Sequence, residues 1–261
     1  MGLALFDTHA HVQLSAFDAD RDDTLARARI ANVLGVLNVG IDVESSRAAA
    51  SLAEHSDQCW ATAGLHPHDA DAWTGDLRAE LRDIAGGPRV VAIGETGLDY
   101  YRDLTPRDMQ ATAFRGQIEL SIDLGLPLVI HNRDATDDVL AILGDYVGVA
   151  RPLLHCFGDS DDVASRAIEM GCVLGIGGTV TYPKSQALRD TVAGLPDGSF
   201  VLETDSPWLT PQCRRGKRNE PAYVVAVAEQ VAELRGISVA ALATTTTDAA
   251  RNLFSIDAAE A

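Results

Sequence analysis

Eight short apolar segments recur along the chain, and their spacing limits the possible fold more than any other feature. We expect these segments to be β-strands, at residues 3–7, 33–40, 60–65, 90–94, 128–131, 153–156, 173–176 and 200–204. The repeat averages about 28 residues, the length that one strand, one helix and two short loops require. Nearly continuous apolar strands that alternate with helices are typical of a parallel sheet whose outer face is covered by helices.

The segments between the strands carry helix signals. Acidic residues fill the first turn of the stretch 18–31, where the helix dipole favours negative charge. Thr105 and Pro106 have the pattern of an N-cap followed by proline at the first helical position, and Gly125 can end the helix that they open. Further helices are expected at residues 134–143, 160–170, 184–192, 221–235 and 239–252.

Eight strand–helix units predict a closed (β/α)8 barrel of the TIM type, which belongs to the α/β class. The 261 residues are within the usual size of such a barrel. We expect residues 1–261 to form a single domain, because no low-complexity segment, charged tail or linker divides them. A doubly wound open sheet is the structural alternative, although eight units are many for it.

The composition argues against several classes of protein. The chain has 38 acidic and 21 basic side chains and a formal net charge of −17, so repulsion from phosphates opposes non-specific coating of nucleic acid. A local basic patch or a bound metal can still offset that repulsion at one site. The four cysteines form no C-x-x-C pair, which favours reduced thiols over a disulfide framework or a zinc knuckle. With no apolar run near the roughly 20 residues of a membrane span and no signal-peptide pattern, we expect a cytoplasmic protein.

Six potential metal ligands stand at the ends of the apolar segments. They are His9, His11, Glu95, His131, His155 and Asp205. Because a parallel barrel places the carboxyl ends of its strands at one rim, these side chains are expected to meet in one site. A lone histidine is more often structural or solvated, and a carboxylate after a strand can cap the next helix. Corresponding positions in several units favour a divided metal site instead.

His9 and His11 are the most specific part of this pattern. Residues i and i+2 of a strand point to the same face, so both imidazoles can face the mouth of the barrel. Glu95 is a poor helix cap, and its two oxygens can bridge two metals about 3.5–4 Å apart. Glu203 shares a face with Asp205 one layer deeper, where we expect it to hold a histidine tautomer rather than to bind metal.

Several segments resemble the motifs of the TatD-family metal-dependent deoxyribonucleases. These segments are residues 7–11, 64–68, 94–100, 130–134, 155–157, 202–208 and 215–224. They cover nearly the whole chain in the order of the family. The resemblance implies a metallo-dependent hydrolase barrel that cleaves DNA phosphodiester bonds as a 3′-5′ exodeoxyribonuclease. The chain departs from the family at Gly158 and Asp159, which concerns the substrate rim rather than the ligands.

The resemblance also implies two divalent ions. One would be held by His9, His11, Glu95 and Asp205, and the other by Glu95, His131 and His155. Asp205 and Glu95 would then be catalytic, Asp205 by orienting the attacking water and accepting its proton, and Glu95 by bridging the two ions. Four imidazoles favour zinc, manganese or iron, whereas the resemblance implies activity with magnesium. We therefore expect two divalent ions and leave Mg, Mn and Zn open.

Residues at the barrel mouth are expected to contact a DNA substrate that is single-stranded or presents a 3′ end. The candidates are His66, Arg133, Lys184, Arg215 and Trp208. The cations would neutralise phosphate charge, and Trp208 would stack on a base. The competing interpretations are solvated surface groups for the cations and packing under its own loop for Trp208.

Two other functional classes compete with a nuclease. A small-molecule amidohydrolase or lactonase uses a similar barrel, but many of these enzymes bridge their metals with a carboxylated lysine on the fourth strand, where this chain has Glu95. A metal-bound scaffold without activity is the third class. The intact set of ligands argues against it.

Overall fold

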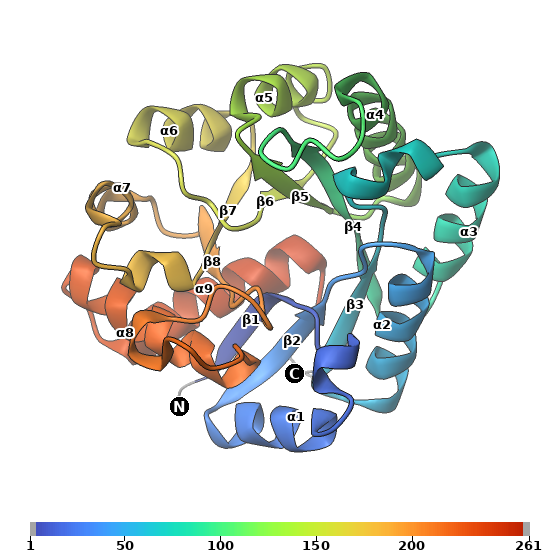
Figure 1. The fold of residues 1–261 in the computed structure, drawn as a ribbon. Helices are drawn as coiled ribbons and strands as arrows, with labels where there is room; N and C mark the ends of the chain where they lie inside the picture. The colour runs from blue at the N-terminus through green and yellow to red at the C-terminus, as the bar shows by residue number, and fades with distance from the viewer. Residues whose placement is uncertain (1–3, 258–261) are drawn as a thin grey trace.

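A computed structural model describes residues 4–257, in which eight parallel strands form one barrel (Figure 1). The strands are β1 (Leu5–Ala10), β2 (Val33–Asn38), β3 (Cys59–Ala63), β4 (Val90–Asp99), β5 (Leu128–Arg133), β6 (Pro152–Leu154), β7 (Val173–Ile176) and β8 (Phe200–Leu202). Their order in the sheet is their order in the sequence, and a bridge between Ala10 and Ser206 joins the segment after β8 to the end of β1. The predicted (β/α)8 barrel is therefore confirmed, and the open doubly wound sheet is wrong. The predicted start of the first strand at Leu3 lies outside the described residues.

Helices surround the barrel (Figure 1). They are α1 (Arg21–Ile30), α2 (Val43–His55), α3 (Gly75–Ala85), α4 (Arg107–Leu124), α5 (Thr136–Gly144), α6 (Asp161–Glu169), α7 (Gln186–Gly194), α8 (Val224–Arg235) and α9 (Val239–Phe254). Short 3-10 segments are η1 (Ser15–Phe17), η2 (Pro67–Ala72), η3 (Gly178–Thr181), η4 (Gln212–Arg214) and η5 (Pro221–Tyr223). Helices α2 and α3 fill the two intervals for which the sequence pattern named no helix. Within residues 4–257, no helix has the length and apolar character needed to cross a membrane.

The start of α4 corrects one prediction. Thr105 is buried and its hydroxyl donates to the carbonyl oxygen of His68 at 2.6 Å, so it does not cap the helix. The N-cap is Pro106, and the helix begins one residue later than predicted. Gly125 ends α4 as predicted, in the left-handed conformation with φ 67° that glycine adopts without steric cost.

The interior of the barrel has an apolar floor. The cluster contains residues from seven of the strands and the inner face of α9: Phe6, Leu37, Val39, Trp60, Ala92, Val129, Leu153, Val201, Ala249, Ala250, Leu253, Phe254 and Ile256. The rings of Phe6 and Phe254 stack 6.4 Å apart, so α9 closes this end of the barrel. Side chains two residues apart in a strand share a face. The positions that follow Val129, Leu153 and Val201 by two are therefore directed into the next layer, toward the mouth.

Candidate metal centre

A pocket of about 730 Å³ opens at the mouth of the barrel, where the carboxyl ends of the strands meet. Five of the six predicted ligands line it: His11, Glu95, His131, His155 and Asp205. The sixth, His9, is fully buried beside them. The backbone N–H of Asp205 donates to the carbonyl oxygen of His9 at 2.8 Å, so the contact that closes the barrel also brings these two side chains together.

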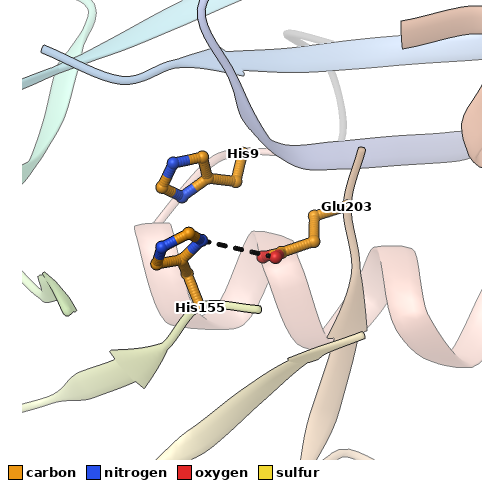
Figure 2. A group of neighbouring side chains, drawn as sticks. All are labelled: His9, His155 and Glu203. Atoms are coloured by element: carbon orange, nitrogen blue, oxygen red, sulfur yellow. Dashed lines mark ion pairs between the residues drawn. The ribbon is translucent and has the colours of Figure 1, made fainter. Parts of the chain in front are cut away.

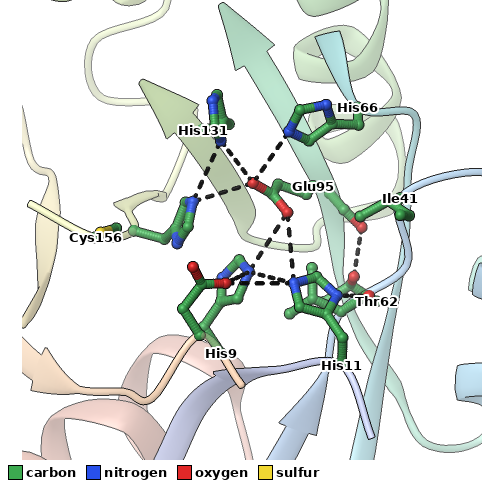
Figure 3. A network of polar contacts seen from close by, with 12 residues as sticks. His9, His11, Ile41, Thr62, His66, Glu95, His131 and Cys156 are labelled. Atoms are coloured by element: carbon green, nitrogen blue, oxygen red, sulfur yellow. Dashed lines mark hydrogen bonds and ion pairs between the residues drawn. The ribbon is translucent and has the colours of Figure 1, made fainter. Parts of the chain in front are cut away.

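Glu95 lies inside β4 and not directly after it, which corrects the predicted end of that strand. The strand continues to Asp99, and its pairing with β5 shifts between Ile93 and Thr96. Gly94 and Glu95 therefore form a bulge. A bulge can re-aim a side chain near an active site, and here the carboxylate of Glu95 lies among the histidines (Figure 3).

One oxygen of Glu95 faces a first group of ligands. Its Oε2 atom lies 3.4 Å from Nε2 of His9 and 3.8 Å from Nε2 of His11. These two nitrogens are 3.2 Å apart. Oδ1 of Asp205 lies 3.8 Å from the first nitrogen and 3.6 Å from the second. The donor atoms of His9, His11 and Asp205 are close enough together to hold one ion.

The other oxygen of Glu95 faces a second group (Figure 3). Its Oε1 atom lies 2.9 Å from Nδ1 of His131 and 3.0 Å from Nε2 of His155. These two nitrogens are 3.5 Å apart. The structure thus brings all six predicted ligands together and places Glu95 between two sets of donor atoms.

Hydrogen bonds on the far side of the rings fix which nitrogen faces the centre. Nδ1 of His11 lies 2.8 Å from the carbonyl oxygen of Val39. Nε2 of His131 lies 3.1 Å from Oδ2 of Asp99. A carbonyl and a carboxylate only accept, so each of these nitrogens carries a hydrogen. When each ring is neutral, Nε2 of His11 and Nδ1 of His131 are then the nitrogens that can bind an ion at the centre.

The carboxylate of Glu203 faces the imidazole of His155 (Figure 2). It is fully buried, and its Oε1 atom accepts from the backbone N–H of Cys156 at 2.6 Å and lies 3.5 Å from Nδ1 of His155. The rings of His9 and His155 stack with centroids 3.9 Å apart. Donor atoms of His9, His155 and Glu203 form a third group close enough to hold an ion, so Glu203 is nearer to being a ligand than the sequence suggested.

The charges of the centre depend on one another. Burial acts to raise the pKa of Glu95, but the imidazoles of His155 and His66 outweigh it and hold that pKa well below its usual range. Burial acts to lower the pKa of His155, but Glu95 and Glu203 outweigh it and hold that pKa well above its usual range. The carboxylates of the cluster therefore stabilise a positive charge placed between them. Lone pairs and carboxylates that converge on such a point fit a divalent cation.

Three of the five predicted substrate contacts line the pocket, namely His66, Arg133 and Trp208. Nε2 of His66 lies 3.6 Å from Oε1 of Glu95, and burial lowers the pKa of this histidine to about 3. His66, Glu95 and His131 also form a group that can hold an ion, so His66 lies closer to the donor atoms than expected. The half-exposed ring of Trp208 meets His11 edge-on at 5.1 Å.

The other two predicted contacts, Lys184 and Arg215, are not among the residues that line the pocket. The guanidinium of Arg215 lies 4.8 Å from the ring centroid of Tyr182. The guanidinium of Arg133 lies 3.9 Å from the ring centroid of Tyr101, which belongs to the loop between β4 and α4. Guanidinium groups held against rings keep their N–H edges available for phosphate.

Sequence reasoning did not single out Asp99, Arg102 and Leu104, which are among the residues that line the pocket. Asp99 had a detectable signal. It follows Glu95 by four residues within a segment that resembles a family motif, and alternate residues of a strand share a face. Arg102 and Leu104 lie in the loop after β4, and no periodic pattern marks a loop residue that turns toward a pocket.

An eight-stranded parallel barrel with histidines and carboxylates clustered at its mouth defines the class of metal-dependent hydrolase barrels. The model of the family described as TatD related DNase matches residues 6–255. The chain belongs to this family. The resemblance found in the sequence is thereby confirmed, together with the expectation of a hydrolytic nuclease.

Related proteins match this chain over their full length. A Bacillus subtilis protein named uncharacterized metal-dependent hydrolase YabD is 41% identical over 254 residues, which cover 97% of this chain and 100% of the relative. An Erwinia tasmaniensis protein named 3'-5' ssDNA/RNA exonuclease TatD is 38% identical over 259 residues, with coverage of 97% and 100%. The crystal structure of YjjV, a TatD homologue from Escherichia coli, superimposes with a TM-score of 0.93 at 29% identity and covers 98% of this chain and 100% of its own.

Proposed function

We propose that this protein is a metal-dependent exonuclease that removes nucleotides from the 3′ end of single-stranded DNA. The observation that supports this most is the position of Glu95, whose two oxygens lie 3.4 Å from His9 and 3.0 Å from His155. A shared carboxylate between two donor groups is the arrangement that two-metal phosphodiester hydrolysis uses. The relatives named as exonucleases support the choice of reaction.

Two divalent ions are part of this proposal. His9, His11, Glu95 and Asp205 would hold the first, and Glu95, His131 and His155 the second. Ions at such a centre lower the pKa of water and neutralise charge on phosphoryl oxygens. The imidazole donors favour zinc or manganese, and magnesium is the further candidate because it commonly binds together with substrate phosphates.

Asp205 is proposed to orient the attacking water and accept its proton. Burial acts to raise the pKa of Asp205, but the neighbouring imidazoles of His11, His155 and His9 outweigh it and lower that pKa. The carboxylate is therefore ionised at neutral pH and can accept a hydrogen bond from water in the pocket, which it lines. Glu203 is proposed to hold His155 from below, as contacts behind a ligand do in metal sites.

The substrate would enter past Trp208 on one side and past Arg133 on the other. Trp208 is 49% exposed, so its ring can stack on a terminal base. Arg133 and His66 line the pocket near the second group of ligands, where phosphate would lie. Lys184 and Arg215 are proposed to contact the strand beyond the pocket. These cations would offset the repulsion that a chain of net charge −17 exerts on DNA.

Residues 1–261 would act as one barrel domain. The protein would work in the cytoplasm, a proposal supported by the four free cysteines, since thiols persist in reducing compartments.

A nuclease assay on chelator-stripped protein tests the function. Mg²⁺, Mn²⁺ or Zn²⁺ is added back singly, with single-stranded DNA labelled at its 3′ or its 5′ end as substrate. We expect immediate release of the 3′ label and gradual shortening of the 5′-labelled strand. Internal cleavage, or hydrolysis of small amides or lactones without any cleavage of DNA, would reject the proposal.

A further inference from the structure

Asp99 ends β4 on the same side of the barrel as His131. The pairing of β4 with β5 continues past the bulge at Glu95, with Gly97 opposite His131. A Cβ atom at Gly97, whose φ is 135°, would collide with the carbonyl oxygen of His131. Glycine at this position therefore allows the two strands to run close together. This close approach brings Asp99, which is fully buried, beside the imidazole of His131.

One oxygen of Asp99 is committed to histidines. Its Oδ2 atom lies 3.1 Å from Nε2 of His131 and 2.9 Å from Nε2 of His68. Because the carboxylate only accepts, His131 must donate from Nε2. In the neutral ring Nδ1, which lies 2.9 Å from Oε1 of Glu95, is then the nitrogen that can bind an ion. Asp99 thus decides which nitrogen of His131 is offered to an ion.

The other oxygen of Asp99 is committed to the loop that follows β4. Its Oδ1 atom accepts from the backbone N–H groups of Tyr101 at 3.0 Å and Arg102 at 2.7 Å. We call residues 100–106 the rim loop. Arg102 and Leu104 of this loop line the pocket, and the ring of Tyr101 lies under the guanidinium of Arg133. The shape of this wall of the pocket therefore depends on the same carboxylate.

The main chain of Asp99 is anchored as well. Its N–H donates to Oε1 of Gln110 at 2.8 Å, and Nε2 of Gln110 donates to the carbonyl oxygen of Thr105 at 2.8 Å. Gln110 on α4 thus joins the two ends of the rim loop. With its backbone fixed, the side chain of Asp99 cannot leave His131 without also releasing the loop.

We propose that Asp99 is a positioning residue that links the second group of metal ligands to the rim loop. It holds the tautomer of His131 with one oxygen and the conformation of residues 100–106 with the other. The inference rests on the proposed function in one respect, namely that His131 binds an ion. It adds that ion binding at His131 and the shape of the substrate-facing wall are coupled through one side chain, as coupling between two sites requires.

Asp99→Asn separates the two roles. Asparagine keeps one oxygen for the N–H groups of Tyr101 and Arg102, but its amide nitrogen cannot accept from His131. The proton of His131 would then have to move to Nδ1, where it faces Glu95. We expect Mn²⁺ titration of chelator-stripped protein to show the ion at the second group bound about 10- to 100-fold more weakly, the usual effect of losing such a contact, with the first ion unchanged. A His131→Ala variant identifies which binding step belongs to the second group.

Asp99→Ala removes both roles. We expect the same loss of the second ion, and in addition cleavage by trypsin after Arg102 at least about tenfold faster than in the wild type, because two hydrogen bonds that order the loop are absent. Mass spectrometry of the fragments locates the cut. Asp103→Asn is the matched control: this exposed carboxylate of the same loop contacts Arg107 at 3.3 Å, and the variant should bind both ions and resist trypsin as the wild type does.

Unchanged affinity for the second ion in Asp99→Asn would overturn the proposal, and so would unchanged cleavage after Arg102 in Asp99→Ala. Equal weakening of both ions would show a general disturbance and would also overturn it. These measurements use no nucleic acid. A wild-type protein that binds two ions but degrades no DNA would therefore contradict the proposed function while leaving the role of Asp99 standing.

Discussion

The Oε2 atom of Glu95 lies 3.4 Å from Nε2 of His9, although the two residues belong to strands on different sides of β2 and β3. The contact exists because a bulge in β4 directs this side chain across the mouth of the barrel. Both groups are buried, so water does not screen their interaction as it would at the surface.

Glu95→Gln should abolish activity and binding of both ions. The amide has no charge and cannot serve two cations. Several kcal/mol of transition-state stabilisation would be lost, which corresponds to a fall in kcat/KM of about 10³-fold or more. The measurement is single-turnover cleavage of 3′-labelled DNA together with metal content. Glu80→Gln, at an exposed position on α3, should behave as the wild type. A Glu95→Gln protein that retained two ions would contradict this role.

Glu203→Gln should weaken ion binding by about 10- to 100-fold and leave the fold intact. The amide oxygen can still accept from the N–H of Cys156, a bond of 2.6 Å in the structure. Its nitrogen can no longer stabilise the imidazole of His155, which lies 3.5 Å from the carboxylate. Calorimetric titration with Mn²⁺ measures the change, and a thermal melt verifies folding. Unaltered affinity would mean that His155 needs no partner behind it.

Trp208→Ala should raise KM for single-stranded DNA about 5- to 100-fold with little effect on kcat. Loss of one stacked base costs about 1–3 kcal/mol, and each 1.4 kcal/mol is about tenfold in affinity. Trp208→Phe retains a ring and is expected to recover most of the loss. If the alanine variant instead melts at a lower temperature with an unchanged KM, Trp208 packs under its loop and does not touch substrate.

Arg133→Gln should reduce the dependence of DNA binding on salt. If its guanidinium contacts a phosphate, its removal lowers the slope of log affinity against log salt concentration by about 1. Affinity is measured at several salt concentrations with Ca²⁺, or no added ion, to prevent cleavage. Arg47→Gln is the control, because Arg47 faces Glu80 at 3.4 Å on the outer helices. Equal slopes for the wild type and Arg133→Gln would place the phosphate elsewhere.

Asp20→Asn should lower stability at neutral pH but not in acid. A hydrogen bond from Arg218 and another from Arg27 lower the pKa of Asp20 below its usual value. Its contribution to stability is therefore present above the unfolded pKa of about 3.9 and is lost as the pH falls through the folded value. Urea unfolding from pH 7 to pH 3 should show a gap between wild type and variant that narrows below about pH 4. The exposed Glu169→Gln serves as control, and a gap independent of pH would contradict the assignment.

Local patterns were sufficient to predict the architecture and the place where the six candidate ligands meet. Alternating apolar strands and helices are short-range features, and a parallel barrel is the arrangement that buries eight such units. His9 and His11 are two residues apart in a strand, so their shared direction follows from strand geometry alone. His155 directly follows one short apolar strand, and Asp205 closely follows another. Both therefore lie at the rim where the carboxyl ends of the strands meet. The sequence could therefore place the six candidate ligands in one site before any contact was known.

Contacts between strands decided the rest. The bulge that aims Glu95 depends on how β4 pairs with β5, and no property of residues 90–99 alone specifies that register. The stacking of His9 on His155 above Glu203 arises where β1, β6 and β8 curve toward one another. The link from Asp99 to His131 exists for the same reason. Sequence by itself determined which side chains reach the mouth of the barrel, because strand and helix periods are local. Only the tertiary structure decided which atoms face each other there, because register and curvature are set by packing among distant segments.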